Sequence, residues 1–281
     1  MEIKDKRIDA GKAFDWGKTS EHYAKYRDIY PEEFYRRVVD RGLCITGQKV
    51  LDLGTGTGVL PRNMYRYGAE WIGTDISPNQ IEQAKKLASE SGMNIEFKAV
   101  SAEQIDFPAA SFDVITACQC FLYFNHVKVA PILHRILKND GRLVILYMAW
   151  LPFEDEIAGK SEDLVRKFNP DWTGGGETKR PITIPEVMYD YFDLEDREEY
   201  ELKVPFTRES WHGRMIACRG VGASLSSEEL ERWDHEHREF LKNVPDSFDV
   251  LHYSAVAILK RKNKKLQFVL RNALANGCLG V

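Results

Sequence analysis

The architecture of this chain can be worked out from residues 50–60, VLDLGTGTGVL. The segment begins as an apolar strand, and Gly54, Gly56 and Gly58 then precede a helix. Glycine allows a sharp turn and lets a ligand lie against main-chain N–H groups at a helix N-terminus. Twenty-one residues after Gly54, Asp75 ends the next predicted strand, where a carboxylate can accept hydrogen bonds from both hydroxyls of a ribose. Strand, glycines, helix, strand and acid in this order predict an α/β unit that binds a nucleoside.

Strands and helices alternate on both sides of this segment. Five short apolar runs are KVLDLG (49–54), EWIGTDI (70–76), NIEFKAV (94–100), FDVITAC (112–118) and RLVILYM (142–148). One intervening helix is predicted to begin at Ser77-Pro78, and another to end at Gly141. Because such strands pair in parallel through right-handed crossovers, we predict a doubly wound α/β fold.

The regular alternation stops after residue 150. Two further strands are predicted at 199–206 and 249–261, between aromatic-rich segments. We therefore expect a mostly parallel, Rossmann-like sheet of seven strands, with an N-terminal helical lid and a late insertion over the strand ends. The expected divisions are a lid (1–45), a cofactor-binding core (46–150), the insertion segments with the last two strands (151–262) and a tail (263–281).

Composition narrows the function classes. The 281 residues carry 39 lysines and arginines against 43 acidic residues, a net charge of −4, which argues against a nucleic-acid partner. No apolar run reaches the roughly 20 residues that span a bilayer, so no membrane association is expected. The start, MEIKDKRIDAGK, predicts no secretory signal. Five cysteines without CxxC spacing favour a reducing, cytoplasmic location. Oligomeric state is not predicted.

Two cofactor classes fit a glycine loop after a first strand. A dinucleotide pattern, G-x-G-x-x-G, would place its third glycine at position 59, which is Val59. Asp52, two residues before the first glycine, would repel a pyrophosphate but suits a ligand with an ammonium group. S-adenosylmethionine has that ammonium and a ribose, and it has no phosphate. A P-loop is excluded because no G-K-[ST] follows the glycines.

The chain resembles the class I S-adenosylmethionine-dependent methyltransferases, in particular the ubiquinone-biosynthesis-like enzymes that act on small molecules. The resemblance covers about residues 20–150, and its motifs are VLDLGTGTG, GTDIS, SAEQIDF, FDVITACQCFLYF and LKNDGRLVIL. It implies a methyltransferase that uses S-adenosyl-L-methionine to methylate a small molecule. An NAD(P)-dependent oxidoreductase and a non-catalytic regulator that binds S-adenosylmethionine are the alternatives.

The resemblance also implies roles for individual residues. The methionine end of the cofactor would be held by Asp52, Gly54, Gly56 and Gly58. Asp75 would bind the ribose, and Ile76 would pack on the adenine. Two pairs follow later strands: Ala102 with Glu103 at the adenine edge, and Cys118 with Gln119 beside the methionine portion. Many relatives carry aspartate where this chain has Ser101.

Aromatic residues mark two further regions. Tyr23, Tyr26 and Arg27 would share one face of a helix, either as a lid over the cofactor or as a core-packing stripe. In the insertion, large residues suit an apolar, planar or cationic substrate, or else pack the insertion onto the sheet. These substrate candidates are Trp150, Trp172, Trp211 and His212.

The sequence identifies no general base firmly. Tyr123, just after the fourth strand, and His212 are the candidates to test. His126 and His134 are expected to be surface or core residues, and His235 and His237 are expected to face solvent. Because no histidine, cysteine or acidic residues have metal-ligand spacing, no metal is predicted.

Overall fold

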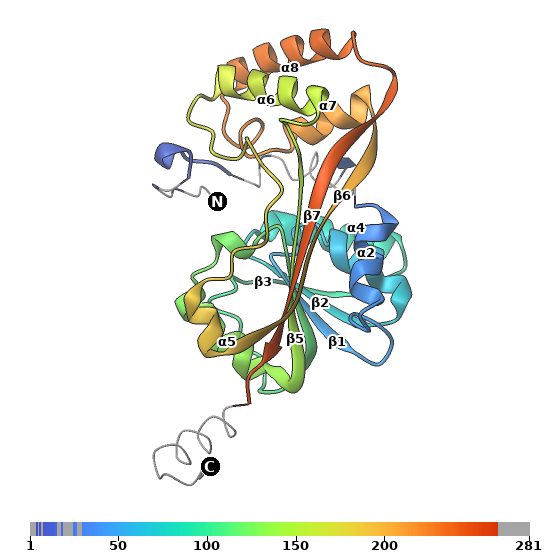
Figure 1. Ribbon diagram of the computed structural model, residues 1–281, viewed down its shortest axis with the longest axis vertical. Coiled ribbons are helices and arrows are strands. Elements are labelled where there is room, and N and C mark those ends of the chain that lie inside the picture. The colour runs from blue at the N-terminus through green and yellow to red at the C-terminus, as the bar shows by residue number, and fades with distance from the viewer. Residues whose placement is uncertain are drawn as a thin grey trace, which may run out of the picture.

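A computed structural model describes residues 4, 6, 8–15, 18, 25–26 and 30–263. In this part of the chain, seven strands form one sheet in the order β3-β2-β1-β4-β5-β7-β6 (Figure 1). The first five strands are parallel, and β7 runs antiparallel to both of its neighbours. The mostly parallel, Rossmann-like sheet of seven strands is therefore confirmed. The strands are β1 (Lys49–Leu53), β2 (Glu70–Asp75), β3 (Glu96–Ala99), β4 (Phe112–Cys118), β5 (Leu137–Trp150), β6 (Phe192–Thr207) and β7 (Ser247–Arg261).

Five of the seven α-helices named in this paragraph begin at a residue whose side chain caps the helix. Ser77 accepts a hydrogen bond from the Gln80 N–H, and Pro78 follows at the first helical position, as predicted. The predicted helix end at Gly141 is wrong: Leu137 already pairs with Phe112, so the chain is extended from there on. The α-helices are α2 (Glu32–Val39), α3 (Val59–Met64), α4 (Pro78–Glu90), α5 (His126–Ile136), α6 (Glu156–Phe168), α7 (Arg208–Ile216) and α8 (Ser227–Leu241). Short 3-10 helices are η1 (Asp9–Gly11), η3 (Tyr65–Tyr67), η4 (Phe121–Tyr123) and η5 (Glu186–Asp190).

Both faces of the sheet are buried, as expected for a doubly wound fold. Alternate residues of β5 face opposite ways: Val144 and Leu146 pack in the cluster that contains α2 and α3 side chains, and Leu143 and Ile145 pack in the cluster of α5 and η5. None of the described helices is long and apolar enough to cross a membrane.

The late segments form a cap beyond the carboxyl ends of the parallel strands. The strands β5, β6 and β7 are 14, 16 and 15 residues long, and they reach from the sheet to α6, α7 and α8 (Figure 1). Inside the cap, Trp211 packs edge-on against Trp150, at 5.5 Å between ring centroids. Residues 8–15 join the cap, because the Asp15 N–H donates to the Ala223 carbonyl at 3.1 Å.

One prediction about the cap is wrong. His235 is exposed, but His237 is fully buried rather than facing solvent. Trp233, His237 and Leu241 recur every four residues along α8, and this stripe is the face that α8 buries. The expectation that both histidines face solvent rested on the charged residues between them.

Candidate functional site

The glycine loop between β1 and α3 has a backbone that side chains would disturb. Gly54, Gly56 and Gly58 all have positive φ, at 58°, 57° and 75°. A Cβ at Gly54 would lie 2.7 Å from Cβ of Cys120, so the turn after β4 abuts the loop directly. A Cβ at Gly58 would lie 2.9 Å from the ring of Phe97 on β3. The loop therefore lies between the ends of neighbouring strands, with its backbone closely packed.

Asp75 ends β2 and is oriented by backbone groups on both sides. The Gly56 N–H donates to Oδ2 at 2.9 Å, and the Ser77 N–H donates to Oδ1 at 2.8 Å. Burial raises the pKa of Asp75, and these two hydrogen bonds oppose that rise. Each carboxylate oxygen keeps a further lone pair, so the group can still accept hydrogen bonds from two ligand hydroxyls.

Asp52 lies on β1, buried below the loop. Its Oδ1 accepts a hydrogen bond from the Thr116 hydroxyl at 2.6 Å, and the two residues are register partners on adjacent strands. Burial raises the pKa of Asp52 to about 7, against the lowering effect of the Thr116 hydrogen bond. Within the described part of the chain, no lysine or arginine is among the groups that shift this pKa. A cation arriving above Asp52 would therefore meet a carboxyl group without a cationic partner among the described residues, and would favour its ionised form.

The ends of β3 and β4 complete this edge of the sheet. Ala102 is buried, and Glu103 accepts a hydrogen bond from the Asn125 N–H at 2.8 Å. The Cys118 thiol donates to the Tyr30 hydroxyl at 3.7 Å. Gln119 has a φ of 65°, and its side-chain amide donates to the Met148 carbonyl on β5. These predicted residues thus lie at the carboxyl ends of adjacent strands, together with the glycine loop and both acids.

The residues present fit S-adenosylmethionine. Ile76, directly after Asp75, leaves 49% of its surface exposed, which suits packing against a planar base. Asp75 is half-buried with its carboxylate fixed, as a ribose-binding acid requires. Asp52 places an acidic group at the loop, and none of the described lysines or arginines shifts its pKa. A pyrophosphate would be disfavoured beside that charge.

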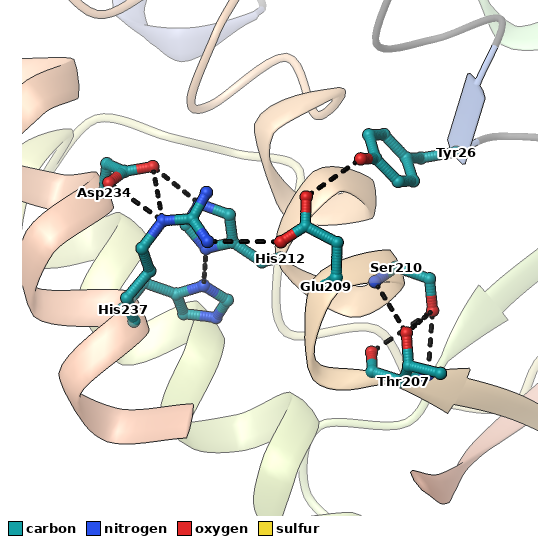
Figure 2. Close-up of polar contacts among 8 residues, drawn as sticks. Tyr26, Thr207, Glu209, Ser210, His212, Asp234 and His237 are labelled. Atoms are coloured by element: carbon teal, nitrogen blue, oxygen red, sulfur yellow. Dashed lines mark hydrogen bonds and ion pairs between the residues drawn. The ribbon is translucent and has the colours of Figure 1, made fainter. Parts of the chain in front are cut away.

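The N-terminal residues of the prediction are only partly described. Tyr23 and Arg27 lie outside the described residues. The ring of Tyr26 packs on α7, where a Cβ at Gly213 would lie 2.3 Å from it. The Tyr26 hydroxyl donates to Glu209 at 3.0 Å (Figure 2). Tyr26 therefore contacts the cap, and its predicted contact with the cofactor stays a prediction.

The four substrate candidates lie inside the cap or at its margin, and all four are buried. Trp150 and Trp211 donate their indole N–H groups to Glu162 at 2.6 Å and to Ser161 at 2.9 Å, both on α6. Trp172 packs so tightly against Gly220 that a Cβ there would lie 2.6 Å from the indole. These side chains shape the cap in this structure, and their contact with a substrate stays a prediction.

His212 belongs to a buried chain of hydrogen bonds (Figure 2). Its Nε2 is 2.7 Å from Oδ1 of Asp234, and its Nδ1 is 2.8 Å from Nδ1 of His237. Burial lowers the pKa of His212 and lowers that of His237 to about 3, so both rings are neutral. The carboxylate can only accept, so His212 carries its proton on Nε2 and accepts from Nδ1–H of His237. Both ring nitrogens of His212 are thus occupied.

Tyr123, the other candidate base, is differently placed. It lies in η4 directly after β4, three residues beyond Cys120, and 39% of its surface is exposed. Its hydroxyl oxygen accepts a hydrogen bond from Arg219 at 3.2 Å. Of the two candidates, Tyr123 is the exposed one, and it lies in the turn whose Cys120 packs on the glycine loop.

Sequence reasoning missed several polar residues that build this region. Thr116 could have been found, because it is a polar residue in the apolar run FDVITAC, directly beside Asp52 in a parallel register. Asp9, Thr173 and Arg219 carry no local signal, since their contacts join segments far apart in the chain. In the described part of the chain, no group of histidine, cysteine or acidic residues could hold a metal ion.

This chain is similar to known proteins in sequence and in fold. A family described as methyltransferase domain matches residues 50–141. The ubiquinone biosynthesis O-methyltransferase of Actinobacillus pleuropneumoniae serotype 5b is 36% identical over 188 residues, which cover 62% of this chain and 78% of the relative. The corresponding protein of Bartonella bacilliformis is 44% identical over 116 residues, covering 40% and 47%. The crystal structure of YcgJ from Bacillus subtilis superposes with a TM-score of 0.52 at 22% identity, covering 83% of this chain and all of that one, and so supports the fold. The chain spans about half the length of the first curated relatives that it matches.

Proposed function

The chain belongs to the class I S-adenosylmethionine-dependent methyltransferase family, and we propose that it transfers a methyl group from S-adenosylmethionine to a small molecule. One observation carries the proposal. The glycine loop, Asp52 and Asp75 converge at the carboxyl ends of β1 and β2, with Gly56 and Asp75 joined by a 2.9 Å hydrogen bond. A backbone loop flanked by two carboxylates suits a ligand with a cationic amino acid end and a ribose.

Each residue has a defined task in cofactor binding. Asp75 accepts hydrogen bonds from the ribose hydroxyls, and its own orientation is fixed by the N–H groups of Gly56 and Ser77. Ile76 covers the adenine, and Asp52 attracts the ammonium of the methionine end. The cofactor supplies an electrophilic methyl group on a sulfonium. The task of the protein is to hold the acceptor in line with that methyl group and to exclude water.

The acceptor binds on the cap side of the glycine loop. The turn after β4 supports this position, because Cys120 packs on Gly54 and the exposed Tyr123 lies three residues further on. Where the acceptor carries a proton, the Tyr123 phenol is the group placed to receive or orient it. In this proposal the buried Trp150 and Trp211 support the acceptor side from within the cap, on a framework anchored to α6.

The test is methyl transfer from labelled cofactor into a fractionated low-molecular-weight cell extract, with release of S-adenosylhomocysteine as the second readout. The expected result is label in at least one fraction with wild-type protein and at least about tenfold less with Asp75→Ala at limiting cofactor. Calorimetry with S-adenosylmethionine and with NADH accompanies it. Binding of NADH alone would overturn the proposal in favour of an oxidoreductase. Tight binding of S-adenosylmethionine with no labelled product in any fraction would favour a non-catalytic regulator.

A further inference from the structure

Arg219, in the segment after α7, lies at a buried junction of four chain segments. Its Nε donates to Oδ2 of Asp9 at 2.9 Å, and its Nη2 donates to Oδ1 at 3.0 Å. Nη2 also donates to the Thr173 hydroxyl at 2.9 Å, and Nη1 donates to the Tyr123 hydroxyl at 3.2 Å. Arg219 is 9% exposed and Asp9 is fully buried. The junction therefore joins the N-terminal segment, the segment after α6, the segment after α7 and the turn after β4.

Asp9 and Thr173 fix the direction of the guanidinium. Asp9 also accepts hydrogen bonds from the N–H and the hydroxyl of Thr173, at 2.7 and 2.9 Å, so its carboxylate is saturated and cannot rotate freely. The backbone at Asp9 has a φ of 48°, a value that residues other than glycine rarely adopt. Since a guanidinium is planar, binding Nε and Nη2 determines where Nη1 points. Nη1 is the nitrogen that reaches Tyr123.

We propose that Arg219 is a positioning residue that sets the Tyr123 hydroxyl on the acceptor side of the methyl-transfer site. An arginine can only donate, so the Tyr123 oxygen accepts and the phenol proton is not used in this contact. The turn that carries Tyr123 packs on the glycine loop through Cys120 and Gly54, so the orientation of the phenol is set relative to the cofactor loop. This inference rests on the proposed function, because only an acceptor gives the orientation a purpose.

Four variants distinguish a role of Arg219 in positioning Tyr123 from a contribution of Arg219 to the stability of the fold. Arg219→Lys keeps the charge facing Asp9 but loses the planar set of donors. The double variant Asp9→Asn/Arg219→Gln removes both charges, so no uncompensated carboxylate stays buried. Arg142→Lys is the matched control, because Arg142 also binds one carboxylate through two nitrogens, that of Glu195, in a pocket at the opposite end of β5. Tyr123→Phe removes the proposed target.

The first measurement needs no acceptor. Amide hydrogen exchange in residues 121–125 should rise at least about tenfold in both Arg219 variants and stay unchanged in Arg142→Lys. Calorimetry with S-adenosylmethionine should give an affinity within about twofold of wild type, since Asp52 and Asp75 are untouched. Unchanged exchange in residues 121–125 would overturn the inference, whatever the outcome of the activity assay.

The second measurement uses the methyl-accepting extract fraction. Turnover at saturating cofactor and acceptor should fall about ten- to a hundredfold in Arg219→Lys, because small misplacements of a positioned group have effects of this size. Combined with Tyr123→Phe, the same change should produce little further loss. Full turnover in Arg219→Lys, with wild type active, would refute the positioning role and would leave the proposed function standing. Absence of turnover in wild type would instead refute the proposed function, and the exchange measurement would still decide whether Arg219 holds the turn.

Discussion

Acidification should weaken S-adenosylmethionine binding through Asp52, and the variant Asp52→Asn should reverse the direction of this pH dependence. The carboxyl group of Asp52 is buried, its pKa is raised to about 7, and no lysine or arginine of the described residues is among the groups that shift this pKa. If it attracts the cofactor ammonium, only its ionised form binds well. Affinity should therefore be highest above the pKa of Asp52 and should fall as the pH drops through it.

The size of the effect follows from the two titrations. With a pKa of about 7, the ionised fraction of Asp52 falls from about three quarters at about pH 7.5 to about one tenth at about pH 6, roughly an eightfold change. An α-amino group titrates at about 7.8, so the protonated fraction of the ligand rises about 1.5-fold over the same interval. The product is a cofactor affinity about sixfold weaker at about pH 6 than at about pH 7.5.

Isothermal titration calorimetry at these two pH values measures the effect in wild type and in Asp52→Asn. The asparagine keeps an oxygen that can accept the Thr116 hydrogen bond, so the variant removes the titration with little change of shape. Only the ligand ammonium then titrates, and the affinity of the variant should be about 1.5-fold tighter at about pH 6. A wild-type affinity that does not fall on acidification, or a variant that falls equally, would refute a contact between Asp52 and the ammonium.

Three further outcomes are expected. Asp75→Ala should weaken cofactor binding at least about tenfold in a folded protein, because each charge-assisted hydrogen bond to a ribose hydroxyl contributes about 1.5–3 kcal/mol; calorimetry showing wild-type affinity would contradict this assignment. Gly54→Ala should lower the free energy of unfolding more than Gly42→Ala, by about 1–3 kcal/mol, since both have positive φ but only the Cβ at Gly54 meets Cys120; equal losses in urea unfolding would argue against the close packing. His252 is buried with a pKa lowered to about 3 against about 6.5 when unfolded, so it destabilises the fold increasingly as the pH falls below about 6.5. Wild type should lose about 2 kcal/mol more than His252→Asn between about pH 7.5 and about pH 5, and parallel losses in the two proteins would show that the ring is not buried in its neutral form.

Short sequence patterns were enough to predict the sheet and the cofactor-binding candidates at the carboxyl ends of its strands. Ser77-Pro78 set the start of α4, and the spacing from Gly54 to Asp75 placed the loop and the acid on adjacent strands. These features depend on residues close in sequence or on regular strand pairing, which a pattern can capture. The burial of His237 was missed for a related reason. Charged neighbours obscure the stripe of Trp233, His237 and Leu241, and this stripe is buried because α6 and α7 pack against it.

The junction at Arg219 could not have been predicted in this way. Asp9 and Arg219 are 210 positions apart, and neither belongs to a periodic pattern. Asp9 lies in a charged N-terminal segment that also reads as a solvated tail. Its burial depends on four donors that reach it from Thr173 and Arg219, and only the tertiary fold brings these residues together. Single-sequence patterns carry no information about such contacts.

The length of β5, β6 and β7 has a mechanical consequence. The ladder between β6 and β7 is paired from Phe192 and Arg261 at the base of the sheet to Thr207 and Ser247 at the cap. This continuous ladder joins the cap to the sheet. Bending the ladder would break inter-strand hydrogen bonds in the middle of the sheet, so we expect the cap and the sheet to move as one body. We therefore expect ligands to reach the site alongside the β6–β7 ladder, and not through an opening between these strands. We expect ligands to enter past segments that lie outside the ladder, among them residues 8–15 and the turn after β4.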